Sequence, residues 1–244
     1  MSHSTGKKRF VLTIAITLLA AVSLFSWDEG YLSLTVPVKT DGILTVEPEL
    51  SARMLDVIPP DRAAFRISDG VVILDSMRAT VSYLTNRREL SAEFSGWLPV
   101  GPFFIGAAVE GIWADDTAAP DGRYWSGAAT VFASGWIVPS LLNAALNVQY
   151  DLYFGRLNAG LGVSVSVIPD TLSIVAEGLF SPLNAFSWAW QAGVLIKTAG
   201  HQFLLYVGNG NDMRMRNILA AAPDPGAVAF GITVRRKIEL LYRQ

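Results

Sequence analysis

Apolar and polar residues alternate strictly between Leu157 and Val167, in the stretch LNAGLGVSVSV. Every odd position carries leucine, alanine or valine, and every even position carries asparagine, glycine or serine. A period of two residues indicates a β-strand with one apolar and one polar face. The stretch is longer than the roughly five or six residues that are common in globular sheets. Its length suits a sheet that separates two different surroundings.

The same alternation, interrupted by turn residues, predicts strands along most of the chain. We expect about twelve of them, with about ten to fourteen possible, joined as consecutive hairpins. The predicted strands cover residues 43–57, 64–74, 77–85, 89–98, 103–113, 124–136, 141–153, 157–167, 171–181, 188–198, 201–208 and 227–242. This pattern predicts an all-β fold, an up-and-down antiparallel transmembrane β-barrel.

The connections between these strands alternate between short and long. The short set comprises residues 75–76, 99–102, 137–140, 168–170 and 199–200, and the other set contains every long connection, 114–123, 182–186 and 209–226. Bacterial outer-membrane barrels have short periplasmic turns and longer external loops. The sorting therefore favours a barrel over a soluble periplasmic β-sandwich, and it predicts that both chain ends face the periplasm.

Composition agrees with a membrane barrel. Hydrophobic residues make up 51% of the chain and charged residues only 16%. Beyond the N-terminal segment, no stretch holds the roughly twenty consecutive apolar residues that a spanning helix needs. High hydropathy without such a helix is typical of strands whose apolar faces contact lipid, so we expect the lipid bilayer as a partner. A formal net charge of −2 gives no reason to expect nucleic-acid binding.

The N-terminal segment resembles an export signal in its layout. Lys7, Lys8 and Arg9 precede an apolar run at 10–21, and Ala21 and Ser23 are small residues of the kind that signal peptidase reads. We expect a signal peptide at 1–23, a periplasmic lead-in segment at 24–42 and the barrel at 43–244. An uncleaved anchor helix is the alternative, because 11–27 is near the lower limit of spanning length. Either reading predicts export through the periplasm to the bacterial outer membrane.

Several tryptophans lie at the ends of predicted strands, namely Trp97, Trp113, Trp125, Trp136 and Trp188. Tryptophan favours membrane–water interfaces, and barrels carry aromatic girdles at both interfaces. We therefore expect these side chains to lie at the two rims of the apolar band.

The polar faces of the strands would line the interior of such a barrel. A charged side chain on the lipid face costs about 2–4 kcal/mol at the bilayer midplane, so charges should point inward and pair. The predicted lumen-lining charged residues are Glu93, Glu110, Asp151, Glu177, Lys197, Arg235, Lys237 and Glu239. Arg236 is an exception, because it shares its parity with Ile232, Val234 and Ile238.

Two functions fit a polar interior. An open lumen predicts a narrow passive pore for small solutes, whereas a closed, salt-bridged interior predicts a structural scaffold for a periplasmic or surface protein partner. At about twelve strands, the barrel would lie between filled eight-stranded forms and open sixteen-stranded porins. The sequence does not indicate an oligomeric state.

Signals for catalysis are sparse. The chain has no cysteine, which excludes thiolate chemistry, and His3 falls in the predicted signal, so imidazole chemistry would depend on His201. A membrane-embedded lipid-acting enzyme would need a serine and an acidic or amide partner beside that histidine. No such motif surrounds His201 in the sequence, so we expect no enzyme activity, no cofactor and no metal site.

The run from Val194 to Phe203, VLIKTAGHQF, is followed by Asn209, Met213 and the pair Phe230-Gly231. This part resembles a family of bacterial outer-membrane β-barrels that is known only as a domain of unknown function. That family has a Gly-Gly-His turn and a closing Phe-Gly strand, and here Ala199 replaces the first glycine. The resemblance implies an outer-membrane location and a barrel fold, and it implies no particular activity.

Overall fold

The computed structural model describes residues 34, 42–54, 63–85, 88–115, 122–182, 187–209, 219 and 228–242. Nearly all of them belong to strands or to the short turns between strands. The strands are β1 (Gly42–Met54), β2 (Ala63–Ile73), β3 (Met77–Leu84), β4 (Glu89–Val100), β5 (Phe103–Ala114), β6 (Tyr124–Val138), β7 (Leu142–Asp151), β8 (Arg156–Ile168), β9 (Leu172–Ser181), β10 (Ser187–Thr198), β11 (His201–Gly208), β12 (Ala229–Arg236) and β13 (Ile238–Tyr242). None of the helical structure in these ranges is long and apolar enough to cross a membrane.

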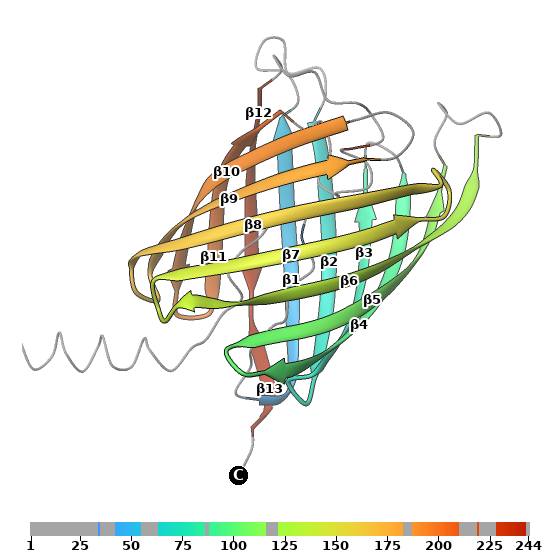
Figure 1. The fold of residues 1–244 in the computed structure, drawn as a ribbon. Helices are drawn as coiled ribbons and strands as arrows, with labels where there is room; N and C mark the ends of the chain where they lie inside the picture. Colours follow the sequence, from blue (N-terminus) through green and yellow to red (C-terminus); the bar gives the residue numbers. More distant parts are fainter. Residues whose placement is uncertain are drawn as a thin grey trace, which may run out of the picture.

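The sheet closes on itself because β1 pairs with the last two strands (Figure 1). Residues 49–54 of β1 pair with β12, and residues 42–46 pair with β13. β12 and β13 are two parts of one final strand that is interrupted at Lys237. The described strands therefore form a closed 12-strand antiparallel up-and-down barrel, which confirms the expected fold class and excludes two packed sheets.

The interruption at Lys237 lies one residue beyond the position opposite Pro48. Glu49 pairs with Arg235 and Val46 pairs with Ile238, so the register places Pro48 level with Arg236. Proline has no N–H group and cannot donate to a sheet ladder, which explains why the regular pairing stops there. Because the register is the same on both sides of the gap, the barrel stays closed across it.

The strand β4 continues to Val100, beyond the end that the sequence predicted at Leu98. The N–H of Trp97 donates to the carbonyl of Ser76 at 2.9 Å, and N–H groups two residues apart point to the same side of a strand. The backbone nitrogen of residue 99 therefore points to the same side as that of Trp97. It lies past Met77, the first residue of β3, so β3 offers it no partner. The missing N–H of Pro99 costs no ladder hydrogen bond at this place, so the prediction of a turn at 99–100 was wrong.

The strand β7 ends at Asp151, earlier than the predicted end at residue 153. The carboxylate of Asp151 accepts a hydrogen bond of 2.8 Å from the backbone N–H of Phe154. Aspartate commonly stabilises a turn by this local bond, which competes with continuation of the strand. Gly155 then completes the turn with a φ of 58°, a conformation that glycine adopts without a steric penalty.

The two faces of each strand differ as the alternation predicted. On β8 and β9, Leu161 and Ile174 are each 52% exposed, whereas Ser164 and Ser173 are each 1% exposed. The exposed side chains lie on the outer face of the barrel and the buried ones on its inner face. This is the reverse of a soluble domain, where the apolar face is buried, and it suits a barrel surrounded by lipid.

Trp97 departs from the expected aromatic girdle. It is only 4% exposed and forms a buried cluster on the inner face with Val72, Ala108 and Phe132. Its position at a strand end was predicted correctly, but its parity matches that of the inward-facing Ser95 and Glu93. Trp125 and Trp188, by contrast, are 80% and 45% exposed on the outer face.

The predicted signal peptide at 1–23 and most of the lead-in segment at 24–42 lie outside the described residues. Within that lead-in segment the structure describes Leu34 and Gly42. Leu34 is buried, with 6% of its surface exposed.

Two glycines in neighbouring strands provide a matched test of the packing. A Cβ atom at Gly193 would lie 2.5 Å from the carbonyl oxygen of Leu205, whereas a Cβ atom at Gly178 would meet nothing within 4 Å. We expect Gly193→Ala to lower the free energy of unfolding by about 1–3 kcal/mol, because the backbone must shift. Gly178→Ala should be neutral or stabilise by up to about 1 kcal/mol, because alanine loses less conformational entropy.

Urea unfolding in detergent micelles, followed by the loss of the faster-migrating folded band on an unboiled gel, measures both changes. Equal midpoints for the two variants would contradict the described pairing of β10 with β11.

Candidate functional site

The candidate site is the inner face of the barrel wall. The odd residues of β1 from Thr45 to Arg53 are buried there, and so are polar side chains from most other strands. A charged group on this face avoids lipid, and it can bond to partners on the neighbouring strands. The inner face therefore holds nearly all the ionisable groups of the described strands.

All the charged residues that the sequence predicted for the lumen lie on this inner-facing register. Asp151, Glu177, Lys197 and Lys237 are buried, and Glu93, Glu110, Arg235 and Glu239 are partly exposed. They do not form one cluster. Instead, they are distributed from β4 to β13, at different levels of the wall.

Some of these residues lie beside one another. Glu93 and Glu110 are direct register partners on β4 and β5. Glu93 also pairs with Arg78 at 3.5 Å, and Lys237 lies 3.4 Å from Glu239. The others have separate surroundings, such as Glu177, whose carboxylate accepts a 3.3 Å hydrogen bond from the side-chain amide of Gln191.

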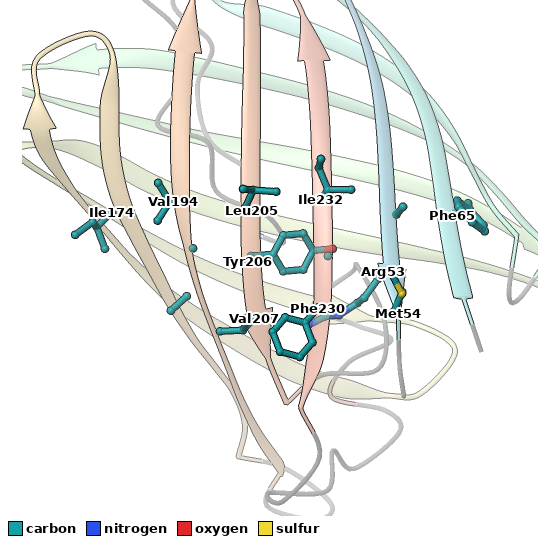
Figure 2. A pocket seen from close by; sticks show the side chains of 14 residues that line it. Arg53, Met54, Phe65, Ile174, Val194, Leu205, Tyr206, Val207, Phe230 and Ile232 are labelled. Carbon is teal, nitrogen blue, oxygen red and sulfur yellow. The ribbon is translucent and has the colours of Figure 1, made fainter. Parts of the chain in front are cut away.

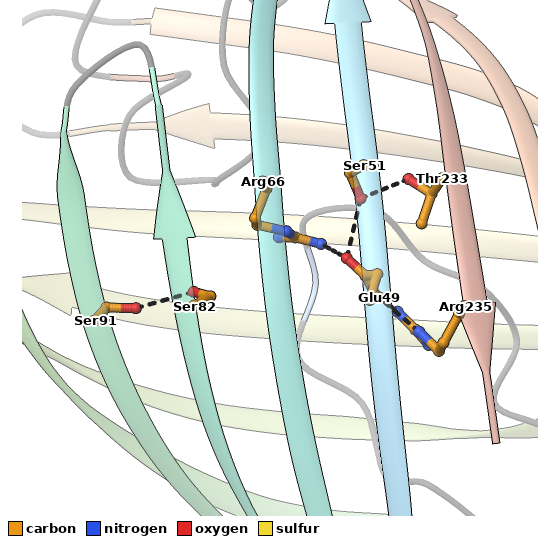
Figure 3. Close-up of polar contacts among 7 residues, drawn as sticks. All are labelled: Glu49, Ser51, Arg66, Ser82, Ser91, Thr233 and Arg235. Atoms are coloured by element: carbon orange, nitrogen blue, oxygen red, sulfur yellow. Dashed lines mark hydrogen bonds and ion pairs between the residues drawn. The ribbon is translucent and has the colours of Figure 1, made fainter. Parts of the chain in front are cut away.

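The strongest polar contacts centre on Glu49, a residue outside the predicted set. Its carboxylate accepts hydrogen bonds from Arg235 on one neighbouring strand, at 2.9 Å to Nε and 2.5 Å to Nη2. On the other side it pairs with Arg66 of β2. Figure 3 shows Glu49 between the two arginines, so β12, β1 and β2 are connected by one carboxylate.

Two hydroxyl groups extend this cluster. Ser51 Oγ donates to Glu49 Oε1 at 3.0 Å and lies 2.9 Å from the hydroxyl of Thr233, its register partner on β12 (Figure 3). Glu49 is only 7% exposed. Hydrogen bonds with charged partners are stronger than neutral ones, and a carboxylate that accepts from two guanidinium groups is well compensated for its burial. We name Glu49, Ser51, Arg66, Thr233 and Arg235 the seam cluster, because they lie where the barrel closes.

Further inner-face charges were absent from the predicted set. They are Glu47, Glu49, Arg53, Arg66, Arg78, Glu89 and Arg156. The same period of two could have found those on β1, since Glu47, Glu49 and Arg53 alternate with Val46, Leu50 and Ala52. Pro48 and the weak apolar character of this strand obscured the pattern.

Arg53 and Tyr206 form a second contact near the seam. The guanidinium carbon of Arg53 lies 5.2 Å from the centre of the Tyr206 ring, within the range of a cation–π interaction. Gly231 lies between their strands in the register, and its lack of a side chain leaves room for the ring, which would otherwise lie 2.2 Å from a Cβ atom. Figure 2 shows the ring of Tyr206 extending across the strand of Phe230 and Ile232.

One part of the inner face is apolar. Ala145, Val175, Leu179, Ala189, Leu195, Leu204 and Tyr206 from β7, β9, β10 and β11 form a buried cluster together with Leu34 and Leu219. Neither leucine belongs to a strand, and Arg156 donates a 3.3 Å hydrogen bond to the carbonyl of Leu219. Leu34, which precedes β1, and Leu219, which lies between β11 and β12, therefore occupy the interior at this wall.

The outer face has a shallow apolar hollow of about 840 Å³ between β9 and β2. Its side chains include Ile174, Val194, Leu205, Phe230 and Ile232 (Figure 2), each of them 40–52% exposed. Such a surface suits lipid chains.

His201 lies on the outer register of β11 as well, with its ring 6.1 Å from that of Phe203. Across the described ranges, no three histidine, aspartate or glutamate side chains gather as a possible metal site.

Comparison with solved structures finds porins of the same fold. A KdgM porin matches with a TM-score of 0.57 and 8% identity, covering 79% of this chain and 98% of that chain. A KdgM porin in complex with disordered oligogalacturonate has a TM-score of 0.55 at 8% identity, with the same coverage of 79% and 98%. A NanC porin in a rhombohedral crystal form has a TM-score of 0.54 at 9% identity and covers 80% of this chain and 100% of that chain. The fold is similar to that of porins.

No protein-family model matches this chain, and no curated protein matches it in sequence. The structural likeness shows a porin-like barrel fold. The resemblance of residues 194–232 to one particular family stays a prediction.

The seam cluster gives a test of how the barrel is held closed. Replacing Glu49 by alanine leaves two partly buried guanidinium groups without their carboxylate, so we expect the free energy of unfolding to fall by about 3–5 kcal/mol. Glu49→Gln keeps an acceptor oxygen and should cost less. The matched control is Glu93→Ala, which removes a longer and more exposed ion pair and should cost about 1 kcal/mol or less.

Urea midpoints of the folded band on unboiled gels measure these losses. A loss at Glu49→Ala no greater than at Glu93→Ala would show that the seam cluster does not stabilise closure.

Proposed function

We propose that this chain forms a narrow passive pore for small polar solutes in the bacterial outer membrane. The observation that carries the proposal is the sorting of the two faces of a closed barrel. Charged and amide side chains occupy the inner face, and apolar side chains occupy the outer face. A wall with this polarity can enclose a water-filled path through lipid, which a filled apolar core cannot do. The likeness in fold to porins supports the same function.

The lumen-lining residues of this pore would include the predicted set Glu93, Glu110, Asp151, Glu177, Lys197, Arg235, Lys237 and Glu239. The remaining residues of the seam cluster, at the closure, and Arg78 on β3 would add to them. Porin selectivity depends on rings and clusters of charged side chains at the narrowest part of the path. These side chains are therefore the ones whose charge should affect permeation.

The charge balance of the inner face favours small solutes without a strong charge. Its basic side chains are Arg53, Arg66, Arg78, Arg156, Lys197, Arg235 and Lys237, and its acidic side chains are Glu47, Glu49, Glu89, Glu93, Glu110, Asp151, Glu177 and Glu239. The two signs nearly cancel and several of these groups pair with each other. One of the similar porins was solved with oligogalacturonate. The near balance in this chain argues for weak charge selectivity.

The pore would be narrow for two reasons. A barrel of 12 strands is intermediate between filled and wide forms. In addition, Leu34 and Leu219 lie against the inner wall beside β9, β10 and β11. These side chains reduce the cross-section that is left for water.

A structural scaffold is the second candidate. The paired charges of the seam cluster, together with the leucines inside the barrel, are the observations that favour it. A barrel with a closed interior would conduct no solute. Its function would be to hold the connections between its strands in position for a partner protein. Conduction by the purified protein distinguishes the two functions.

Single-channel recording of the refolded protein in a planar bilayer tests the pore. We expect discrete conductance steps, and swelling of liposomes in small uncharged sugars. A protein that is folded by its heat-modifiable mobility and yet conducts no ions would contradict the pore and favour the scaffold.

Selectivity gives a residue-level test. Changing Glu93 and Glu110 together to glutamine removes two facing carboxylates from the inner wall, so the ratio of cation to anion permeability should fall by about twofold or more. The control is Asp75→Asn in the β2–β3 turn, where φ is 56° and asparagine is well tolerated. Reversal potentials in a salt gradient measure both. An equal shift in the two variants, or none in the double variant, would contradict the assignment of these carboxylates to the path.

A further inference from the structure

The outer face of the described strands carries two charged side chains, and they have opposite signs. Asp69 on β2 shares its parity with the exposed Phe65 and Ile67, and Arg236 on β12 shares its parity with the exposed Ile232. Both Asp69 and Arg236 are exposed. The other outward-facing side chains of these strands are apolar, aromatic or small, apart from His201 and Thr198 beside a turn.

The two charges lie in one row across three neighbouring strands. Asp69 is the register partner of Pro48 on β1. Pro48 lies level with Arg236, because Glu49 pairs with Arg235 and Val46 pairs with Ile238. Neighbouring strands are about 4.8 Å apart, so the backbones at Asp69 and Arg236 are separated by about 10 Å, with Pro48 midway.

This arrangement is costly if lipid covers it. A charged side chain on the lipid face costs most at the bilayer midplane, about 2–4 kcal/mol for arginine and somewhat less for aspartate, and the cost falls toward the interfaces. Arg236 is the register partner of His201, the first residue after the β10–β11 turn, so its long side chain can extend toward an interface. Asp69 lies near the middle of β2, and its short side chain cannot extend to the interface as an arginine can. Among the described residues, neither charge has an ion pair or a side-chain hydrogen bond.

A hollow of about 550 Å³ adjoins Asp69 on the outer face. Its lining includes the outward-facing Asp69, Val71, Val81 and Phe94 and the small residues Ala79 and Ala92, and it also includes Thr80, Glu93 and Val109. A carboxylate at the edge of an apolar hollow suits a long cationic side chain, whose methylene groups contact the walls while its guanidinium pairs with the carboxylate. Arg236 is such a side chain, and it projects from the same face two strands away.

We propose that the face formed by β12, β1 and β2 binds a second copy of this chain. A two-fold axis along the membrane normal near Pro48 brings Arg236 of the partner subunit to the side of Asp69. Barrel strands tilt by about 40°, so the two ends of this row differ in height by about 6 Å, which the long arginine side chain can span. Arg236 of the partner subunit then enters the hollow beside Asp69, and Asp69 of the partner subunit receives Arg236. A self-complementary patch of this kind is what a two-fold interface requires. Both charges leave the lipid in one step, and the two copies keep the same orientation in the membrane.

The absence of cysteine from the sequence makes this proposal testable by cross-linking. Leu50 on β1 is next to Pro48 on the outer register and is 52% exposed, so Leu50→Cys would lie close to the axis. We expect outer membranes that contain this variant to yield a disulfide-linked dimer with a mild oxidant. Leu161→Cys on β8 is the matched control, because Leu161 is also 52% exposed and β8 runs along the wall opposite β1 and β2 (Figure 1).

Charge reversal tests the ion pairs themselves in the Leu50→Cys background. Asp69→Arg alone and Arg236→Asp alone should each reduce the dimer at least about threefold, because like charges then meet across the axis. The two reversals together should restore it, since each copy again offers one charge of each sign. Heat-modifiable mobility shows that each variant is folded.

The proposal is overturned if Leu50→Cys gives no more dimer than Leu161→Cys, which would leave lipid as the occupant of this face. It is overturned equally if Leu50→Cys links only to a different protein. A dimer that survives either single reversal in a folded variant would refute the pairing of Asp69 with Arg236. These outcomes do not depend on whether the barrel conducts ions.

Discussion

The structure depends on satisfying every backbone hydrogen bond inside the chain. Lipid offers no partners for N–H and C=O groups, so a sheet that crosses the membrane must have no open edge. Closure here falls on β1, which pairs with β2 on one side and with both β12 and β13 on the other. The place of closure carries the most concentrated polar contacts described in the wall, with Glu49 between Arg66 and Arg235. Proline at position 48 is tolerated because the final strand is interrupted one residue beyond the position opposite it.

Closure also determines what each side chain contacts. Once the strands form a cylinder, the period of two assigns alternate residues to lipid and to the interior. The apolar set on the outside needs no further partner, whereas the charges on the inside pair across neighbouring strands. The interior is not uniform, because β9, β10 and β11 contribute apolar side chains that contact Leu34 and Leu219. The polar seam and this apolar wall together give the interior two different sides.

Much of the fold could be predicted from the sequence because strand alternation is a local property. The stretch at 157–167 shows this well, since its parity alone gave the correct outward-facing set. The contacts of the site could not be predicted in this way. Glu49 and Arg235 are 186 positions apart, and their pairing depends on the register accumulated over every hairpin between them. Trp97 shows a second limit, because its position at a strand end suggested an interface while its parity placed it inside. The burial of Leu34 and Leu219 also has no local signal.

The most direct test of closure is a disulfide across the place where β1 meets β12. Ser51 and Thr233 are register partners whose hydroxyl oxygens lie 2.9 Å apart, and the chain has no other cysteine to compete. The double variant Ser51→Cys and Thr233→Cys should form an intramolecular disulfide in folded protein, detected by faster migration of the boiled, non-reduced chain. The pair Ser51→Cys and Ser164→Cys, with the second cysteine on β8, should stay reduced. A folded Ser51→Cys and Thr233→Cys variant that remains as reduced as this control would contradict a closed barrel.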